Sequence, residues 1–406
     1  MHFKAYSKIT LSLLFTFVLY NCSEDTLNSG LAHSNLKLGS LRVDSLYFRN
    51  YNVAPNIASN ERLYLGKKSN IEALFSFVKI NSSPYWDYYY DSTIIVDSLH
   101  FYVYCPDSVF SQIELPNLYF SPDSHFQENT SNFMDYDGFS LTDWSKIGQP
   151  TVKNILDTAG THSHTQLKWT IDTLLHDLVD TLDTNLTRTF AMQIDNTQEN
   201  LIEIYSEEAS TGALDPKVIM YFRQSLLVDD SLETDTSSRI IYSSGDLSIL
   251  YPMLESEQPG MLNLSNGTGT RALIDVPFSV NSLPQGSVIR SANLILPYDS
   301  SVVNLPENLL FDPIDVDTFL IDPEQFYYED PFAGKGIPYA LSINPLLGEY
   351  TVPIKNILQN IIMGNESNSG FKLIANERNN PFLQIPLKVG NNEPNLRLEI
   401  IYVSEE

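Results

Sequence analysis

Cysteine is scarce in this chain. Its 406 residues include two, Cys22 and Cys105. If Cys22 is modified, Cys105 has no partner for an intrachain disulfide, and packed cores must hold the fold together. Cys105 ends an alternating apolar and polar segment that begins at His100. We expect Cys105 to be a buried structural thiol, because a reactive cysteine needs a histidine and a positive environment.

Basic residues are also few. The chain has 24 Lys and Arg against 50 Asp and Glu, a net charge of −26. Removing residues 1–21 takes away Lys4 and Lys8 and no acid, which leaves 22 basic and 50 acidic residues and a charge of −28. Such a charge repels phosphate backbones, so we expect no nucleic-acid partner. It also excludes attachment to an anionic membrane through basic patches.

Sequence motifs of the common enzyme classes are missing as well. The chain contains no G-x-S-x-G, H-E-x-x-H, G-x-x-x-x-G-K-[ST] or G-x-G-x-x-G. These patterns mark α/β-hydrolases, zinc proteases, P-loop proteins and dinucleotide-binding folds. Carboxylate pairs for glycoside hydrolysis require a spatial separation that sequence spacing does not reveal. No catalytic residue is therefore predicted.

The N-terminus is built like a secretory signal. Lys4 and Lys8 precede a largely apolar segment at residues 9–20. A membrane-spanning helix needs about 20 apolar residues, so this shorter segment fits the apolar region of a signal peptide. Leu19-Tyr20-Asn21-Cys22 resembles the lipobox of bacterial lipoproteins, although small residues are usual where Tyr20 and Asn21 stand. We predict cleavage before Cys22 and lipidation of its thiol; the alternative is an ordinary signal peptide with a chance cysteine.

Residues 1–21 are thus a predicted signal peptide, and residues 22–36 are polar and suit a tether. Ser23-Glu24-Asp25 looks like the acidic export signal that Bacteroidota-type bacteria place behind the lipidated cysteine. We expect the chain to be exported and lipid-anchored at the outer membrane or cell surface. The two or more acyl chains of a lipoprotein anchor are enough for stable attachment.

The remaining chain resembles itself. Segments beginning at Leu63 and Leu262 match without gaps at an offset of 199, and Ser98 matches Ser291 at the head of another apolar segment. Towards the end of each copy the offset is 181 over about 50 residues. At that offset the aligned pairs are Trp169 with Tyr350, Phe190 with Phe371, Ile204 with Ile385, Ile219 with Ile400 and Tyr221 with Tyr402. The repeat predicts domains at 37–225 and 237–406, with the acidic, Ser- and Thr-rich residues 226–236 as linker; the alternative is one continuous sandwich.

Local patterns in both copies are mostly those of strands. Residues 100–104, 291–296 and 396–403 alternate between apolar and polar side chains, and Pro, Asn, Gly and Asp bound them. Each copy has one stretch of helical periodicity, at residues 171–179 and 352–362. We predict a mostly β protein with two tandem antiparallel β-sandwich domains, jelly-roll-like, each carrying one short helix.

The second copy resembles a known family, the tandem DNRLRE-type β-sandwich domains of exported bacterial and archaeal proteins. Their order of motifs is N-R-A-L-L-x-F-D, S-A-x-L-x-L, a short helix, G-[FL]-x-L and P-x-L-x-I-x-Y. The chain has the corresponding segments at residues 270–275, 291–296, 351–352, 370–373 and 394–402. Copy one follows less well, with Glu72 in place of Arg271 and no Gly before Phe190. The resemblance implies the fold and an association with cell surfaces and polysaccharide, and no activity.

An aromatic segment marks a candidate ligand site. Copy one carries an insertion that contains Tyr85, Trp86, Asp87, Tyr88, Tyr89 and Tyr90. Exposed aromatic faces stack on sugar rings, and Tyr and Trp also anchor protein interfaces. The alternative is that these rings pack over the end of the sandwich or against copy two.

Acidic loops raise the possibility of calcium. Asp135 and Asp137 stand at alternate positions before Gly138, with Asp143 beyond. Oxygen ligands in a turn of this kind suit Ca²⁺, although the bidentate Glu of an EF-hand is missing. The alternative is a solvated loop, which arises easily in so acidic a chain.

Together these features favour a membrane-anchored, surface-exposed lipoprotein that acts as a non-catalytic binding or structural module. Its partner would be a polysaccharide or a surface protein. Two alternatives stay open: a polysaccharide lyase or hydrolase with an unrecognised site, and a passive structural component of the envelope.

Overall fold

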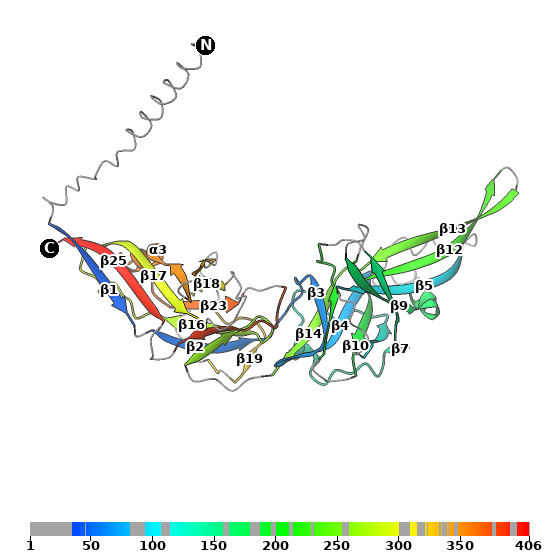
Figure 1. Ribbon diagram of the computed structural model, residues 1–406, viewed down its shortest axis with the longest axis horizontal. Coiled ribbons are helices and arrows are strands. Elements are labelled where there is room, and N and C mark those ends of the chain that lie inside the picture. The colour runs from blue at the N-terminus through cyan, green and yellow to red at the C-terminus, as the bar shows by residue number, and fades with distance from the viewer. Residues whose placement is uncertain are drawn as a thin grey trace, which may run out of the picture.

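The computed structural model describes most of the chain from residue 35 onward as antiparallel β-sheet (Figure 1). The described residues are 35–44, 46–81, 94–106, 114–156, 162–178, 187–195, 200–210, 214–228, 231–253, 260–299, 309–314, 321–322, 324–332, 334, 339–340, 342–344, 348–375, 379–389 and 396–405. The predicted mostly β, sandwich-like class is confirmed. Figure 1 shows two layered units joined end to end in an elongated molecule.

The first sandwich has a seven-stranded and a five-stranded sheet. In the seven-stranded sheet the order is β11 (Leu201–Tyr205), β3 (Arg62–Lys68), β4 (Ile71–Asn81), β10 (Thr187–Gln193), β6 (Asn117–Ser121) and β7 (Ser145–Gly148), with β14 (Asp246–Pro252) also paired to β4. In the five-stranded sheet the order is β13 (Ser231–Tyr242), β12 (Lys217–Val228), β5 (Ile94–Cys105), β9 (Ser163–Thr170) and β8 (Thr151–Leu156).

The second sandwich repeats this plan. One sheet has the order β1 (Leu36–Val43), β25 (Arg397–Glu405), β17 (Val288–Pro297), β22 (Glu349–Pro353) and β21 (Ser342–Asn344). The other has the order β19 (Phe326–Tyr327), β2 (Tyr47–Val53), β16 (Thr270–Asp275), β23 (Phe371–Ala375), β18 (Leu309–Pro313) and β20 (Tyr339–Ala340), and β15 (Met261–Leu264) pairs with β24 (Ile385–Lys388). Among the described pairings, the short β19–β2 pair is parallel.

Each sandwich has its own apolar core, formed by the inward-facing half of each alternating strand. In β5 the buried side chains include Leu99, Phe101 and Val103. Phe101 stacks on Phe190 of the opposite sheet with 4.6 Å between ring centroids. Burying one such ring contributes roughly 1.5–3 kcal/mol. Cys105 is buried in the same core, as predicted from its place at the end of the alternation.

The two predicted helical stretches are short helices beside these cores. In copy one a 3-10 turn, η4 (Asp172–Leu174), continues into α2 (Leu175–Leu178). In copy two, α3 (Lys355–Ile362) buries Leu358 and Ile361. The periodicity at 352 is misleading, because Val352 belongs to β22 and points into the core from a strand. A third short helix, η3 (Phe133–Tyr136), is a 3-10 helix.

The strand pairings revise the predicted domain boundaries. The first two strands of copy one, β1 and β2, pair with β25 and β16 and so belong to the second sandwich. The first two strands of copy two, β13 and β14, pair with β12 and β4 and so belong to the first sandwich. The repeats therefore exchange their leading pair of strands, and neither 37–225 nor 237–406 is a self-contained sandwich.

The exchange is symmetrical in register. Next to β12, Ile241 of the exchanged strand pairs with the buried Val218. Next to β25, Val43 of the exchanged strand pairs with the buried Leu398. The exchanged strands β13 and β1 thus each place an apolar residue opposite a buried residue of the host strand with which they pair.

Residues 226–236 are not a linker. Its described residues, 226–228 and 231–236, lie in the adjacent strands β12 and β13, which pair from Lys217↔Tyr242 to Val228↔Ser231. Polar and acidic composition suggested a linker, but the exposed strand residues 234–236 are also polar or acidic. Alternating Thr and Ser residues are compatible with a strand whose faces are exposed.

Two of the pairs aligned by the repeat face different sides of their sheets: Ile219 with Ile400, and Tyr221, which is exposed, with Tyr402, which packs against the core. Phe190 and Phe371 are both buried, as are Ile204 and Ile385, so those aligned pairs occupy the same side of their sheets. Ile400 is in the core, whereas Ile219 lies on the outer face of β12 and Met220 takes the inward place. A one-residue slip in a strand moves every side chain to the other face.

The two sandwiches meet through the chain segment that follows β2. Ile57 of this segment is buried with Tyr64 and with Phe382 of the second sandwich. The rings of Tyr64 and Phe382 lie edge to face at 5.1 Å. Two hydrogen bonds to Asn379 cross the same junction. Tyr64 Oη donates to the backbone carbonyl of Asn379, and the backbone amide of Glu61 donates to its side-chain oxygen. The alternative of a single continuous sandwich does not describe this arrangement, since each half has its own core.

Candidate functional site

Several sequence-predicted sites lie outside the described residues. These are the lipidation site Cys22, the signal peptide and almost all of the tether. The aromatic segment Tyr85, Trp86, Asp87, Tyr88, Tyr89 and Tyr90 also lies outside them, within the gap between β4 and β5. Their predicted roles stay predictions.

The predicted calcium loop lies within the described residues, and Asp135 forms hydrogen bonds within the protein there. Asp135 Oδ2 accepts a bond from the Asn132 amide at 2.9 Å, as half of a capping box around η3. The same oxygen accepts from Tyr328 Oη at 3.1 Å. Asp137 and Asp143 are exposed. The structure does not gather Asp135, Asp137 and Asp143 into one group of ligands. Their alternate spacing reflects a capped turn.

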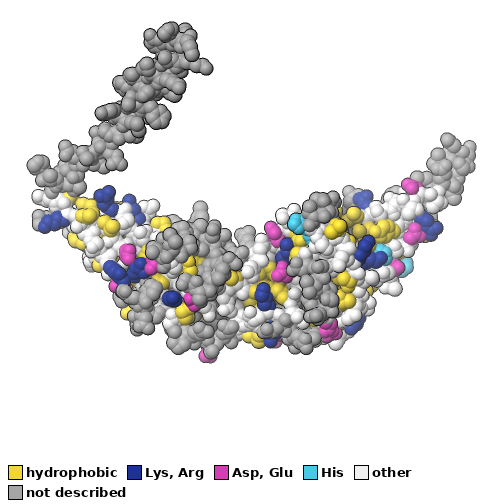
Figure 2. Space-filling model, in the orientation of Figure 1, with side chains coloured by type: hydrophobic (Ala, Val, Ile, Leu, Met, Phe, Trp, Pro, Cys, Tyr) yellow, Lys and Arg dark blue, Asp and Glu magenta, His cyan; other side chains and the backbone are white. Residues whose placement is uncertain are grey.

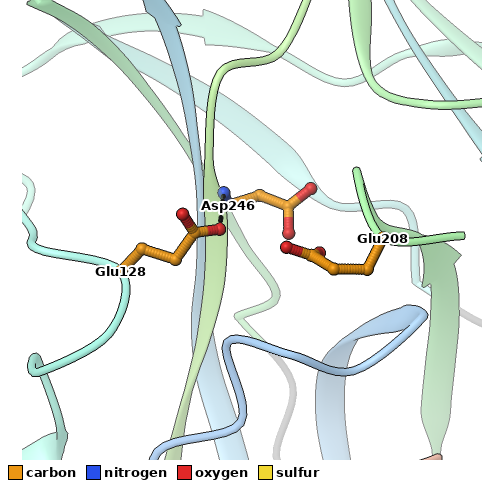
Figure 3. A group of neighbouring side chains, drawn as sticks. All are labelled: Glu128, Glu208 and Asp246. Carbon is orange, nitrogen blue, oxygen red and sulfur yellow. Dashed lines mark hydrogen bonds between the residues drawn. The ribbon is translucent and has the colours of Figure 1, made fainter.

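A different group of carboxylates does converge. Among the residues that the structure describes, one set of three acidic, His or Cys side chains brings its ligand atoms together: Glu128, Glu208 and Asp246, each with an oxygen within 4.8 Å of the others. Figure 3 shows the carboxyl group of Asp246 turned toward that of Glu208, with Glu128 approaching from the other side. We refer to these three residues as the carboxylate triad.

The three residues come from three separate places in the fold. Glu128 lies in the loop between β6 and η3, Glu208 in the turn after β11, and Asp246 is the first residue of the exchanged strand β14. The Asp246 amide donates to Glu128 Oε1 at 3.0 Å. Asp246 Oδ2 accepts from the Glu207 amide at 2.8 Å. The backbone thus holds all three segments at fixed positions around the triad.

Hydrogen bonds from nearby side chains to backbone carbonyls hold these loops in place. Asn56, in the segment that crosses between the sandwiches, donates to the carbonyls of Glu128 and Ser131, both at 2.8 Å. Ser206, two residues before Glu208, donates to the carbonyl of Asn60 at 2.6 Å. Gly245 has a φ of +155°, and a Cβ there would lie 3.0 Å from Glu128 Oε2. Glycine therefore allows Glu128 to approach the start of β14 closely.

Burial and mutual repulsion make the triad electrostatically unfavourable. Asp246 is 1% exposed. Burial first, and then the charges of Glu208, Glu128 and Glu207, raise the pKa of its carboxyl well above the usual range. Burial, followed by Glu128 and other carboxylates, raises the pKa of Glu207 to about 7. Burial also raises the pKa of Glu208 even though its side chain reaches solvent. Negative charge at this place requires a neutralising proton or cation.

Sequence inspection could not find the triad. Glu128 and Asp246 are 118 residues apart and come from different repeats. Only the strand exchange, which long-range pairing decides, brings them together. The one local signal is Gly245 immediately before Asp246, and a Gly-Asp pair is also an ordinary turn sequence.

A second feature is the outer face of the five-stranded sheet in the first sandwich. One row across it runs Tyr242, Lys217, Tyr102 and Lys168 on four neighbouring strands. The next row runs Ile240, Ile219, His100 and Thr170. We call this surface, together with Tyr221 beside the second row, the tyrosine face.

Part of the tyrosine face is open to solvent. Tyr221, Ile240 and Tyr242 are 38%, 44% and 45% exposed. The ammonium of Lys217 lies 4.7 Å from the ring centroid of Tyr104 and 5.5 Å from that of Tyr242. Burial lowers the pKa of Lys217, while Asp215 opposes that shift. His100 lies 5.9 Å from the Tyr221 ring. In Figure 2, apolar side chains gather over β5, β12 and β13 with Lys, Arg and His side chains among them.

Comparisons with known proteins give no match: no protein family, curated protein or solved structure is significantly similar to this chain. Within the described part of the chain, no helix combines the length and the apolar character needed to cross a membrane.

Proposed function

We propose that this protein is a lipid-anchored, surface-exposed binding module of a bacterial envelope, without catalysis, and that it binds a polysaccharide on its tyrosine face. The anchor would be Cys22, which follows a signal-like segment and precedes a polar tether. Two tandem sandwiches support the proposed likeness to DNRLRE-type exported proteins, which rests on motif order.

The tyrosine face is the observation that carries the binding proposal. Tyr221 and Tyr242 present exposed rings on adjacent strands. Between and beside them lie hydrogen-bonding groups, among them His100 and Ser238. Aromatic rings with an apolar body and a polar tip suit the faces of sugar rings, and the neighbouring polar groups suit their hydroxyls.

The place of this face along the molecule supports the same proposal. β1, which follows the predicted tether, lies at one end of the molecule, and the β12–β13 hairpin extends from the other end (Figure 1). A chain tethered through its N-terminus would therefore hold the second sandwich near the membrane. The tyrosine face, on the first sandwich, would point toward material outside the cell.

The mixed chemistry of the face favours a glycan over an apolar protein surface. Exposed Tyr and Ile alternate there with Ser238 and His100, so no continuous apolar patch forms. Protein interfaces of stable complexes bury a more continuous apolar centre. The positive side chain of Lys168, which is partly exposed, favours acidic sugars in a chain that is otherwise strongly negative.

A glycan array tests this proposal. Wild-type protein should bind one class of polysaccharide, and the double variant Tyr221→Ala, Tyr242→Ala should lose at least about tenfold in affinity, because two stacking rings are removed. Tyr47→Ala is the matched control, since Tyr47 is an exposed tyrosine of the second sandwich. Equal binding by all three proteins, or no binding by wild type to any neutral or acidic glycan, would sink the proposal.

The anchor has its own test. Growth with a radioactive or clickable fatty acid should label the wild-type protein and leave Cys22→Ser unlabelled and released from membranes. Labelling of both proteins, or of neither, would contradict lipidation at Cys22. Protease added to intact cells should then degrade the labelled protein if it faces outward.

A further inference from the structure

The carboxylate triad has the composition of a site for a hard cation. Glu128, Glu208 and Asp246 each offer a carboxylate oxygen, and these oxygens lie within 4.8 Å of one another. Two oxygens bound to one Ca²⁺ at about 2.4 Å each can be at most about 4.8 Å apart. The spacing of the triad therefore fits three oxygens around a single ion.

A buried oxygen without a partner points to the same conclusion. Asp246 is 1% exposed, and its Oδ1 has no hydrogen-bond partner. The other oxygen, Oδ2, accepts from the Glu207 amide. A buried carboxylate oxygen left unsatisfied is strongly unfavourable, and a bound cation satisfies it directly. In Figure 3 the Asp246 carboxyl group is turned into the triad, toward Glu208.

We propose that Glu128, Glu208 and Asp246 bind one divalent cation, and that Ca²⁺ is the preferred ion. Three carboxylates with no nitrogen or sulfur donor favour hard cations over zinc or copper. Ca²⁺ tolerates irregular sets of six to eight oxygen ligands, whereas Mg²⁺ demands near-octahedral geometry. Glu208 is exposed, so an ion reaches the site from solvent and water completes its coordination.

The proposed ion would join the two repeats. Glu128 and Glu208 belong to the first repeat, and Asp246 stands at the start of the strand that the second repeat inserts into the first sandwich. Binding would neutralise the repulsion among the three carboxylates. It would also link the start of β14 to the loop that contains Glu128 and the turn that contains Glu208. This inference is independent of the tyrosine face, which shares none of these residues.

Isothermal titration of the metal-stripped full chain with Ca²⁺ tests the site, with thermal unfolding as a second readout. We expect one Ca²⁺ per chain and a melting temperature several degrees higher in excess Ca²⁺, because a ligand that binds the folded state stabilises it. Glu208→Gln and Glu128→Gln should each weaken Ca²⁺ binding at least about tenfold, since each loses a charged ligand.

Glu207→Gln is the matched control. Glu207 is also exposed and adjoins the triad, but its side chain is not part of it. This variant removes a neighbouring carboxyl group without removing a ligand, so its affinity for Ca²⁺ should fall by less than about threefold. Because Glu208 reaches solvent, Glu208→Gln should fold as wild type does, which circular dichroism checks.

Two results would overturn the proposal. The first is a wild-type chain that neither binds Ca²⁺, Mn²⁺ or Mg²⁺ nor changes its melting temperature in their presence, which would leave protonated carboxylates as the explanation of the triad. The second is Ca²⁺ binding that Glu208→Gln and Glu128→Gln weaken no more than Glu207→Gln does, which would move the ion elsewhere.

Discussion

The backbone amide of Asp246 donates a 3.0 Å hydrogen bond to Oε1 of Glu128. This bond joins the first residue of an exchanged strand from the second repeat to a loop of the first repeat. A comparable link exists in the second sandwich, where Tyr51 of the exchanged strand β2 donates to Asp330 at 3.2 Å. In each sandwich, one exchanged strand is therefore held by a carboxylate of its host: β14 by Glu128 and β2 by Asp330.

Replacing Asp246, the buried acid of the triad, should distinguish the effect of carboxylate repulsion on stability from the effect of cation binding. In a chelator, Asp246→Asn should raise the melting temperature, because a buried charge disappears while the side-chain oxygen still accepts the Glu207 amide. In excess Ca²⁺ the same variant should show little of the increase expected for wild type. Differential scanning fluorimetry with and without Ca²⁺ measures both effects; a variant that is less stable than wild type in the chelator would contradict the first.

Removing the charge of Asp330 should destabilise the second sandwich strongly. Asp330 Oδ2 accepts from Arg271 and Lys372, and the Lys372 side chain is 11% exposed. Asp330→Asn leaves both cations without their carboxylate, so we expect a loss of about 3 kcal/mol in the free energy of unfolding. Urea denaturation provides the measurement.

Asp275→Asn is the control for that variant. Asp275 pairs with Arg49 at 3.3 Å on the surface, with both side chains more than 40% exposed. An exposed pair contributes about 0–1 kcal/mol, so the variant should be close to wild type. Equal effects of the two substitutions would show that burial of the Asp330 network is unimportant.

The strand exchange should make the two sandwiches unfold together. Opening either sandwich requires the release of strands that belong by sequence to the other repeat. We therefore expect one calorimetric transition whose van't Hoff and calorimetric enthalpies agree. Leu250→Ala, which removes a 1%-exposed side chain from β14, should lower the whole transition, at a cost of about 2–5 kcal/mol. Two resolved transitions, with only one shifted in Leu250→Ala, would contradict this expectation.

His125 should make the first sandwich sensitive to acid. Its Nε2 lies 2.7 Å from Ser121 Oγ, and its ring lies 4.4 Å from that of Trp144. Burial lowers the pKa of His125, and Asp123 opposes the shift. Because the folded-state pKa is below the unfolded value of 6.5, the unfolded chain takes up the proton first, and stability falls as pH drops through that value.

Thermal unfolding at pH 7.5 and pH 5.5 measures this effect. The decrease in melting temperature on acidification should be smaller in His125→Gln than in wild type. His176→Gln is the control, because His176 is exposed, and it should behave as wild type does. An identical decrease in all three proteins would rule out a role for His125.

Local patterning predicted much of the fold. Alternation from His100 to Tyr104 predicted a strand ending at a buried Cys105, and Cys105 lies in the core together with Phe101 and Val103. The repeat aligned Phe190 with Phe371, and both rings are buried. These predictions hold because the side-chain period of a strand and the burial of apolar residues are local properties of a sequence. The pairs Ile219 with Ile400 and Tyr221 with Tyr402 failed because the two corresponding strands differ by one residue in register.

The sequence by itself determined a mostly β chain of two related halves with one short helix each, and a strongly negative charge. Alternation and composition specify these features without reference to distant residues. Only the tertiary structure decided which sandwich each leading strand joins, because β14 and its partner β4 lie about 170 residues apart in the sequence and no local pattern specifies so distant a pairing. The same long-range pairing brings Asp246 beside Glu128 and Glu208, whereas the local spacing of Asp135, Asp137 and Asp143 produced a capped turn.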